Sequence, residues 1–307
     1  MIREPLDAEA IAEDKAMLKT GRAIRALAAL FAALCMLWAA SGQAQLAADS
    51  RLTSITARKA IRIAYRTDAR PFSFLDGGNA PLGYTIDLCK PVVQSIAQQF
   101  GLQELKIQWV AVTVDTRFSA IADGKADMEC GASTVTLGRM KEVDFSNLVF
   151  LESTGIVVAQ SSNIHSFADM AGRKIAVIAG TTNASAMAEQ IRRQSVDATL
   201  ILVKDREEGV SFLEAGRVDG FASDKLLLTG AKFKSGKAFV VLPDDLSVEQ
   251  YAIALPRGDS ALRLAVNTGL AQIFRSGQAG DVFQRWFFGL RPGPLMQTVY
   301  ALGSLAD

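Results

Sequence analysis

The chain has 307 residues, and its charges nearly cancel: 33 Lys and Arg stand against 32 Asp and Glu, giving a net charge of +1. Such a balance provides no global field that would draw the protein to nucleic acid or to a membrane surface. Half of the residues are hydrophobic and no low-complexity segment is present, which is typical of a globular protein. We therefore expect no nucleic-acid partner.

The first 44 residues have the pattern of a secretory signal peptide. Lys19, Arg22 and Arg25 come before the apolar run ALAALFAALCMLWAA, and small residues suit cleavage after Ala44. The run has about fifteen residues. This is shorter than the roughly 20 residues that span a bilayer, which favours a cleaved leader over a membrane anchor. The expected location of the mature protein is the periplasm.

Two cysteines, Cys89 and Cys130, follow the leader. Thiols outside the cytoplasm tend to oxidise, so we expect one disulfide between them. Two separately buried free cysteines are the alternative. The cysteines are far apart in sequence and the single histidine, His165, has no neighbouring ligand, so we expect no metal site. We expect no cofactor either.

Strand and helix patterns alternate along the chain, which predicts an α/β fold with largely parallel sheets. In the first half, strands are expected at 61–65, 106–112 and 126–130, with helices at 86–100 and 117–123. The alternation begins again after residue 150, with strands at 173–180, 199–204 and 220–223 and helices at 183–194 and 209–215. A strand at 251–255 and helices at 261–275 and 281–288 complete the prediction.

The two halves share one helix–turn–strand pattern. RFSAIADGKADMECG and GVSFLEAGRVDGFAS both run helix, Gly, basic residue, any residue, Asp, strand, which pairs Gly124 with Gly216 and Asp127 with Asp219. Two similar lobes explain this pattern, and chance similarity of amphipathic units is the alternative. The 263 residues after the leader are long for one compact core and sufficient for two lobes.

The predicted strands also suggest where the chain passes between the lobes. Extended segments at about 152–158 and 246–252 are the candidates. The expected organisation is a signal peptide at 1–44, the first part of lobe 1 at 45–153, lobe 2 at 154–248, and a return to lobe 1 with a C-terminal tail at 249–307. Two crossings of this kind make a hinge and a cleft.

The stretch DMECGASTVTLGRMKEVDFS at 127–146 contains no nucleophile with an evident base. Its small hydroxyl residues offer backbone N–H groups and short hydroxyls, and Arg139 offers a planar fork suited to a carboxylate. The stretch is therefore a candidate anion site, with a Ser/Thr-rich turn and a surface arginine as the alternative.

In open α/β sheets, ligands bind beyond the carboxyl ends of the strands. Charged residues that follow predicted strands are thus expected to face a common cleft: Arg66, Arg117, Arg139, Arg206 and Asp224. Thr181 and Thr182 stand between a strand and a helix, where unpaired N–H groups make an anion site and where ordinary N-capping is the alternative. The turn lacks the lysine of a nucleotide-binding loop.

Catalytic signatures are few. There is no Gly-x-Ser-x-Gly elbow and no pair of metal ligands, although Asp224 is placed where a carboxylate base could act. We therefore do not expect an enzyme.

At this point a family resemblance is evident. A secretory leader, RIAYRTDARPFSFLDGGNAPLGYTIDLC, ADMECGASTVTLGRMKEVDFS, SFADMAGRKIAVIAGTT and a final WF-containing helix together resemble the extracellular solute-binding proteins of polar amino acid ABC transporters. The similarity is greatest to their glutamate/aspartate-binding branch and covers the mature chain. It implies a two-lobed periplasmic-binding-protein type II fold, monomeric, that closes over one amino acid and delivers it to a membrane permease.

The resemblance also implies roles for individual residues. Arg139 would bind the α-carboxylate, beside Thr134 and the backbone around Ala132, and Asp224 would bind the α-ammonium. Thr181 and Thr182 would add donors from lobe 2, while Arg66 and Arg117 would reach a side-chain carboxylate. Two departures concern the ligand: Arg206 stands where the branch commonly has a histidine, and Val114 where a serine is expected.

A charge count favours an acidic ligand. If Asp224 and Arg139 hold the two ends common to all amino acids, then Arg66, Arg117 and Arg206 remain in excess, and a second carboxylate would offset them. The alternative is that some of these arginines pair with Asp68, Asp115 or Glu207, which are close in sequence. The competing functional class is an enzyme on the same scaffold, because some dehydratases acting on cyclohexadienyl acids resemble these proteins; a sensor role is a third.

Overall fold

The structure, a computed structural model, describes residues 50–78, 80–231 and 233–306. The expected signal peptide at 1–44 lies outside these residues. Within the described ranges, no helix is both long enough and apolar enough to cross a membrane. The described residues belong to one compact unit, which contains two five-stranded sheets and a short two-stranded one.

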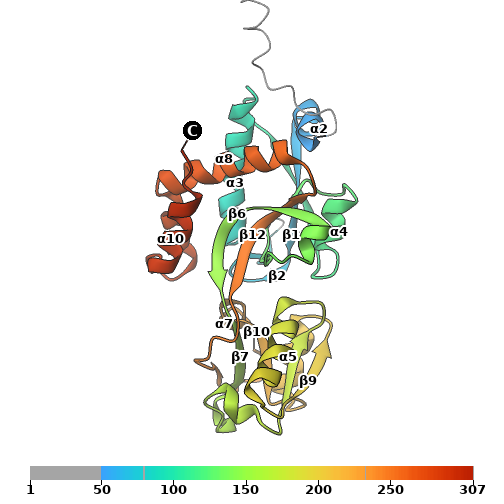
Figure 1. Ribbon diagram of the computed structural model, residues 1–307, viewed down its shortest axis with the longest axis vertical. Coiled ribbons are helices and arrows are strands. Elements are labelled where there is room, and N and C mark those ends of the chain that lie inside the picture. Colours follow the sequence, from blue (N-terminus) through green and yellow to red (C-terminus); the bar gives the residue numbers. More distant parts are fainter. Residues whose placement is uncertain (1–49, 79, 232, 307) are drawn as a thin grey trace, which may run out of the picture. The chain divides into compact units, whose positions relative to one another are not determined.

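The first large sheet, with the helices around it, is called lobe 1 here (Figure 1). Its strand order is β4-β1-β5-β12-β6, and β1 pairs in parallel with β4 and β5 while β12 runs antiparallel to β5 and β6. The strands are β1 (Ala60–Arg66), β4 (Lys106–Val112), β5 (Met128–Glu129), β6 (Val143–Glu152) and β12 (Glu249–Pro256). The helices are α2 (Arg51–Arg58), α3 (Tyr84–Gln99), α4 (Arg117–Ala122), the 3-10 turn η2 (Arg139–Lys141), α8 (Ser260–Arg275), α9 (Gln278–Trp286) and α10 (Pro294–Gly303); the small hairpin is β2 (Asp68–Ala69) with β3 (Ser73–Phe74).

The second large sheet defines lobe 2. Its order is β11-β7-β10-β8-β9, with β10, β8 and β9 parallel and β7 antiparallel to both β10 and β11. The strands are β7 (Thr154–Ala159), β8 (Lys174–Ile178), β9 (Thr199–Val203), β10 (Gly220–Asp224) and β11 (Phe239–Val241). The helices are η3 (Gln160–Ser162), η4 (Phe167–Met170), α5 (Thr182–Gln194), α6 (Arg206–Glu214) and α7 (Lys225–Thr229).

The chain passes between the two sheets where β6 gives way to β7 and where β11 gives way to β12. Only Ser153 separates β6 from β7. The strands β6 and β12 run antiparallel beside each other, with Glu152 as the register partner of Glu249 (Figure 1). All five strands of the second sheet lie within residues 154–248, the segment proposed as lobe 2.

The lobes are built around separate apolar cores. In lobe 2, one face of the sheet packs against α5 and the other against α6, as expected for a sheet that alternates with helices. In lobe 1, a group of aromatic rings joins α3, β6, β12 and the end of α9; its members are Phe72, Tyr84, Phe150, Tyr251, Phe283 and Phe287. Tyr84 also donates a hydrogen bond of 2.8 Å to the carbonyl of Val149.

The repeated helix–turn–strand pattern has the same backbone geometry in both lobes. Gly124 and Gly216 end their turns with φ of 74° and 68°, a region that favours glycine. Asp127 accepts from the amide of Arg62 at 2.7 Å, and Asp219 accepts from the amide of Lys174 at 2.9 Å.

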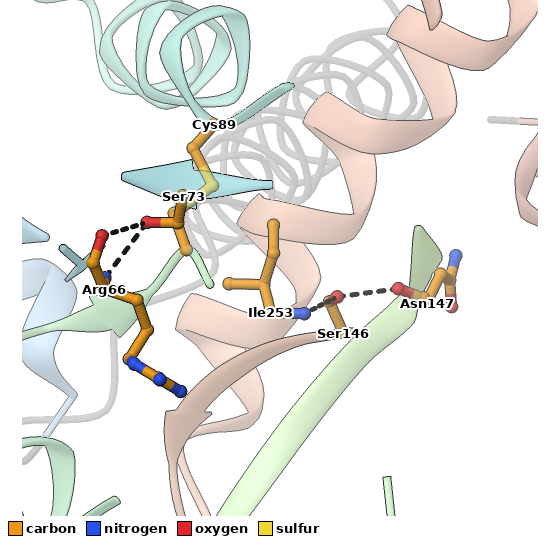
Figure 2. The surroundings of a disulfide bond; sticks show 7 residues. Arg66, Ser73, Cys89, Ser146, Asn147 and Ile253 are labelled. Carbon is orange, nitrogen blue, oxygen red and sulfur yellow. Dashed lines mark hydrogen bonds between the residues drawn. A yellow bond between two sulfur atoms is a disulfide. The ribbon is translucent and has the colours of Figure 1, made fainter. Parts of the chain in front are cut away.

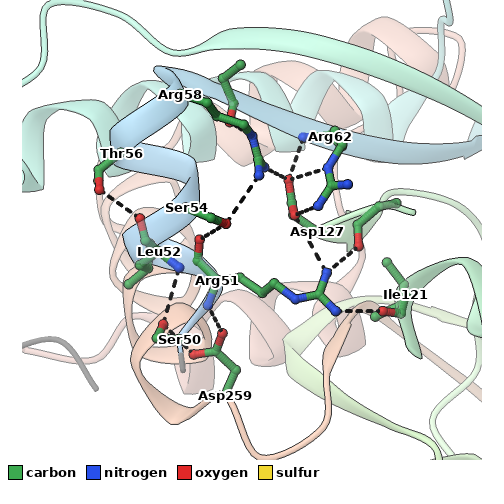
Figure 3. Close-up of polar contacts among 12 residues, drawn as sticks. Ser50, Arg51, Leu52, Ser54, Thr56, Arg58, Arg62, Ile121, Asp127 and Asp259 are labelled. Atoms are coloured by element: carbon green, nitrogen blue, oxygen red, sulfur yellow. Dashed lines mark hydrogen bonds and ion pairs between the residues drawn. The ribbon is translucent and has the colours of Figure 1, made fainter. Parts of the chain in front are cut away.

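The surroundings of the two aspartates differ. Asp127 is fully buried and contacts the side chains of Arg51, Arg58 and Arg62 (Figure 3). Asp219 keeps a third of its side chain exposed and pairs with Arg173 alone at 3.2 Å.

The predicted α/β class is confirmed, with one correction. The sheets are mixed rather than largely parallel, because β12 and β7 each enter their sheet antiparallel. The expected C-terminal tail contains a helix, α10, which was not predicted. Its Met296, Val299 and Tyr300 are buried, and α10 lies against β6 and α8.

Candidate functional site

A small cavity lies between the two lobes and brings together every residue that the sequence analysis assigned to a ligand. Its volume is about 30 Å³, which leaves room for about two water molecules. An amino acid can therefore enter only if the lobes separate or side chains move. The lining residues are the nine predicted ones, Arg66, Arg117, Ala132, Thr134, Arg139, Thr181, Thr182, Arg206 and Asp224, together with Val114, Ile178, Asn183, Ser223 and Leu227.

Arg139 stands at the start of η2, directly after the loop that follows β5. Its Nη1 donates to the carbonyl of Thr134 at 2.7 Å, and its amide donates to the hydroxyl of Thr136 at 3.1 Å. Burial lowers the pKa of Arg139, an effect opposed by the charges of Glu249, Glu129 and Asp224. Arg139 thus lies in the cleft with carboxylates near it and is no surface residue.

Arg66, at the end of β1, already has a carboxylate partner. Its Nε and Nη2 donate to the two carboxylate oxygens of Asp68 at 2.9 and 2.8 Å. The charge count that treated Arg66 as unpaired is therefore wrong, because the next strand, β2, begins two residues later and turns Asp68 back toward it. Arg117 and Arg206 instead donate to neutral oxygens.

Arg117 is the first residue of α4 and is buried. It donates to the carbonyl of Val114 and its guanidinium lies 4.5 Å from the ring centroid of Phe118. Burial, with the nearby charge of Arg139, lowers its pKa to about 9. The charges of Glu129 and Asp115 oppose this lowering, and a further anion at the guanidinium would oppose it more.

Arg206 begins α6 in lobe 2 and reaches across the cleft. Its Nη1 donates to the hydroxyl of Ser223 at 3.2 Å, and its Nε donates to the carbonyl of Asp68 in lobe 1 at 3.3 Å. A second contact between the lobes lies nearby, where Gly230 at the end of α7 fits against the main-chain carbonyl of Arg70. Glu207, which follows Arg206 in sequence, pairs with Lys234 and not with an arginine of the cleft.

Asp224 ends β10 on the lobe 2 side of the cavity. Its Oδ1 accepts from the side-chain amide of Asn183 at 3.3 Å. Burial, together with the charge of Glu249, raises the pKa of Asp224 to about 6. The carboxylate is thus short of positive partners among the described residues, and a ligand ammonium group would provide one.

Glu249, at the start of β12, was not predicted from the sequence. One of its oxygens accepts from the hydroxyls of Thr134 and Thr182 at 2.7 and 2.6 Å, so that a single atom joins lobe 1 to lobe 2. The other oxygen accepts from Ser247 at 2.7 Å and from Thr154 at 3.3 Å. Both threonine protons are therefore given to Glu249 in this arrangement.

Two further carboxyl groups near the cleft were also missed. Glu129 is fully buried at the end of β5. Glu152, at the end of β6, accepts from the amide of Leu226 at 3.3 Å, and burial with the charge of Asp224 raises its pKa to about 8. The only sequence signal for either residue was its place at a strand end.

The expected disulfide is present: Cys89 in α3 is bonded to Cys130, which lies between Glu129 and the loop that carries Ala132 and Thr134. Figure 2 shows that it lies beside Ser73, whose hydroxyl bonds to both the amide and the carbonyl of Arg66. The start of the cleft loop is thus covalently attached to α3.

Comparison with known proteins places this geometry in a family. Residues 61–289 match the model of the bacterial extracellular solute-binding proteins, family 3. The chain belongs to this family, and its two mixed sheets form the two-lobed periplasmic-binding-protein type II fold. Binding proteins of this family take amino acid ligands and work with ABC transporters.

The relatives bind several kinds of amino acid, as their names state. An L-glutamate/L-aspartate-binding protein of Pseudomonas aeruginosa is 32% identical over 74% of this chain and 76% of its own length. A glutamate/aspartate import solute-binding protein of Escherichia coli is 27% identical over 85% of this chain and 87% of its own. A glutamine-binding protein of Bacillus subtilis is 26% identical, covering 76% and 84%.

Among solved structures, an ancestral amino acid-binding protein described as a precursor of cyclohexadienyl dehydratase matches with a TM-score of 0.66 and 28% identity. The match covers 78% of this chain and 99% of that one.

Proposed function

We propose that this protein is a periplasmic receptor that binds glutamate or aspartate and delivers it to an ABC transporter permease. The observation that carries the proposal is the cavity itself, where Arg139 of lobe 1 and Asp224 of lobe 2 line one small space. An α-amino acid carries a carboxylate and an ammonium group on adjacent carbons, so it needs a cation and an anion arranged in this way. Closure of the lobes over the ligand would then present a single bound form to the permease.

An acidic side chain is supported by two further arginines. Arg117 and Arg206 are both buried at the cavity, and their hydrogen bonds to described residues go to neutral oxygens. A ligand carboxylate could accept charge-assisted hydrogen bonds from these guanidinium groups, whereas an amide oxygen would give only the weaker neutral-acceptor bonds. The names of the relatives from Pseudomonas aeruginosa and Escherichia coli agree with this choice.

The test is calorimetry with a panel of amino acids. Glutamate or aspartate should bind more tightly than glutamine or asparagine by about 10- to 150-fold, the value of one charged hydrogen bond of roughly 1.5–3 kcal/mol. Arg117→Ala should narrow that gap while leaving binding of the amides in place. Equal affinity for acids and amides, or tightest binding of a basic amino acid, would contradict the acidic assignment.

An enzyme of the dehydratase type is the second candidate. The structural likeness to a precursor of cyclohexadienyl dehydratase favours it, and Glu129 supplies a buried acid at the cleft. The intact pair of Arg139 and Asp224 favours the receptor, because a binding protein for α-amino acids must neutralise both ends of its ligand. Turnover of prephenate or arogenate by the purified protein would reverse this order.

A further inference from the structure

Four arginines and four carboxylates are counted here among the described residues of the cleft; the exposed Asp115, which also acts on Arg117, is left out because water screens its charge. The arginines are Arg66, Arg117, Arg139 and Arg206, and the carboxylates are Asp68, Glu129, Asp224 and Glu249. Glu152 adds no charge at neutral pH, because its pKa is raised to about 8. A zwitterion with a neutral side chain leaves this balance unchanged. An acidic amino acid, the ligand of the proposed function, brings one negative charge too many into a closed and poorly hydrated space.

Three of the four carboxylates are committed in their ionised form. Asp68 forms a two-pronged ion pair with Arg66. Glu249 accepts from four hydroxyl groups, on both lobes and on the crossing segments. Asp224 faces the position expected for the ligand ammonium group. None of the three can take up a proton without losing an ion pair, a set of charged hydrogen bonds or the ammonium partner.

Glu129 differs from the other three. Neither of its oxygens has a hydrogen-bond partner among the described residues, and both are fully buried. The charges of Arg117 in α4, Arg66 in β1 and Arg139 in η2 act on it, and the Ser133 hydroxyl lies near it without reaching hydrogen-bond geometry. The hydrogen bonds of the three guanidinium groups go elsewhere, to Asp68, to the carbonyl of Val114 and to the carbonyl of Thr134.

Gly131 leaves room for the side chain of Glu129. A side chain at Gly131 would overlap its Oε1, and Cys130, the residue between them, is held by the disulfide. Burial raises the pKa of Glu129 against the opposing charges of Arg117, Arg66 and Arg139, and a second carboxylate at the same arginines would raise it further.

We propose that Glu129 is a specificity-determining residue that binds one proton from solvent when an acidic amino acid enters the cleft. The proton restores the charge balance. The resulting carboxyl group has one O–H, which can donate a hydrogen bond to the ligand's side-chain carboxylate. Two carboxyl groups then share one proton beside the arginines. A neutral amino acid needs no such proton, so binding of glutamate and binding of glutamine should differ by one proton.

Calorimetry in buffers of different ionisation enthalpy measures this proton directly. At pH 7.5, glutamate binding should take up about one proton more than glutamine binding. The two ligands share their ammonium and α-carboxylate groups, so any contribution of Asp224 or Glu152 cancels in the difference. Glutamate affinity should also fall by up to about tenfold per pH unit above neutrality, while glutamine affinity changes less.

The Glu129→Gln variant has the same shape as the protonated side chain. It should bind glutamate with no extra proton relative to glutamine and with an affinity that no longer falls with pH, while the exposed-site control Glu104→Gln should behave as wild type. Thermal unfolding establishes that the variant is folded. The proton count of the wild type tests the proposal even if the variant does not fold.

The outcomes separate this inference from the proposed function. Tight glutamate binding with equal proton uptake for both ligands would overturn the role of Glu129 and leave the receptor for acidic amino acids intact. Equal loss of both ligands in a folded Glu129→Gln would assign the residue a general structural part and would also overturn it. If no amino acid binds the wild type, the proposed function fails first, and this inference fails with it.

Discussion

The two lobes use the same helix–turn–strand unit and end it with opposite charges. In both, the turn aspartate exchanges hydrogen bonds with a neighbouring parallel strand, β1 or β8: the amides of Asp127 and Asp219 donate to the carbonyls of Arg62 and Lys174, at 2.8 Å in each case. Past this point the units diverge. In lobe 1 the chain leaves β5 into a loop that leads to Arg139, whereas in lobe 2 it continues along β10 to Asp224. A common backbone unit thus sets the geometry at the ends of β5 and β10, and the few residues around each strand end determine whether a positive or a negative side chain faces the cleft.

The largest effect should come from removing the charge at either end of the cleft. Arg139→Ala and Asp224→Ala should each weaken binding of every amino acid by roughly 200- to 5,000-fold, because loss of one partner of a buried pair costs about 3–5 kcal/mol. Calorimetry with glutamate and glutamine checks this, with Arg193→Ala, an exposed arginine of α5, as the matched control. Wild-type affinity in either cleft variant would show that the substituted residue does not bind its end of the ligand, the α-carboxylate for Arg139 or the ammonium group for Asp224.

The turns themselves should differ in their contribution to stability. Asp127→Asn removes the negative charge from a fully buried group that contacts three arginines, and should lower the free energy of unfolding by about 1–3 kcal/mol. Asp219→Asn changes a partly exposed pair and should cost about 0.2–1 kcal/mol. Urea unfolding of both variants at neutral pH measures the difference. Equal losses would mean that the backbone hydrogen bonds, which both variants can retain, determine the stability of the turn.

A further effect concerns pH and arises at the lobe 2 end. Burial raises the pKa of Asp224 to about 6, so the unliganded protein binds a proton there as the pH falls through 6. The ligand ammonium group requires the ionised form of Asp224. Titration of Asp224 should therefore lower the affinity for any amino acid by up to about tenfold per pH unit below 6 and leave it level from 6 to 7. Arg139 keeps its charge over the whole range. Titrations of glutamine, whose side chain does not ionise, isolate the effect of Asp224; an affinity that stays level down to pH 5 would place the ammonium group elsewhere.

Sequence alone could identify the residues of the cleft because they follow strands. Arg66, Arg117, Arg139, Arg206 and Asp224 were chosen for that reason, and all five line one cavity. What the sequence could not supply is the set of partners. The contact between Thr134 and Glu249 joins positions 115 residues apart, and nothing near Glu249 distinguishes it from an ordinary strand residue.

The charge count failed for the same physical reason. Asp68 was a possible partner for Arg66, but whether it turned inward depended on the small hairpin of β2 and β3, whose strands have two residues each. Periodicity carries little information over so short a segment. The helix α10 was missed as well: it lies beyond the segments that were assigned, although its buried face packs as an ordinary helix does.

Gly230 lies where the two lobes meet and does not line the cavity. Its φ of −82° is open to any residue, so a larger side chain there would leave α7 and both cores undisturbed. The same side chain would meet the main-chain carbonyl of Arg70 as soon as the lobes came together. Under the proposed function, a variant with such a change would be folded and yet unable to bring its lobes this close. Selection at this position would then act on growth with a scarce nutrient, and among related sequences we expect small residues at position 230 even where the neighbouring surface varies freely.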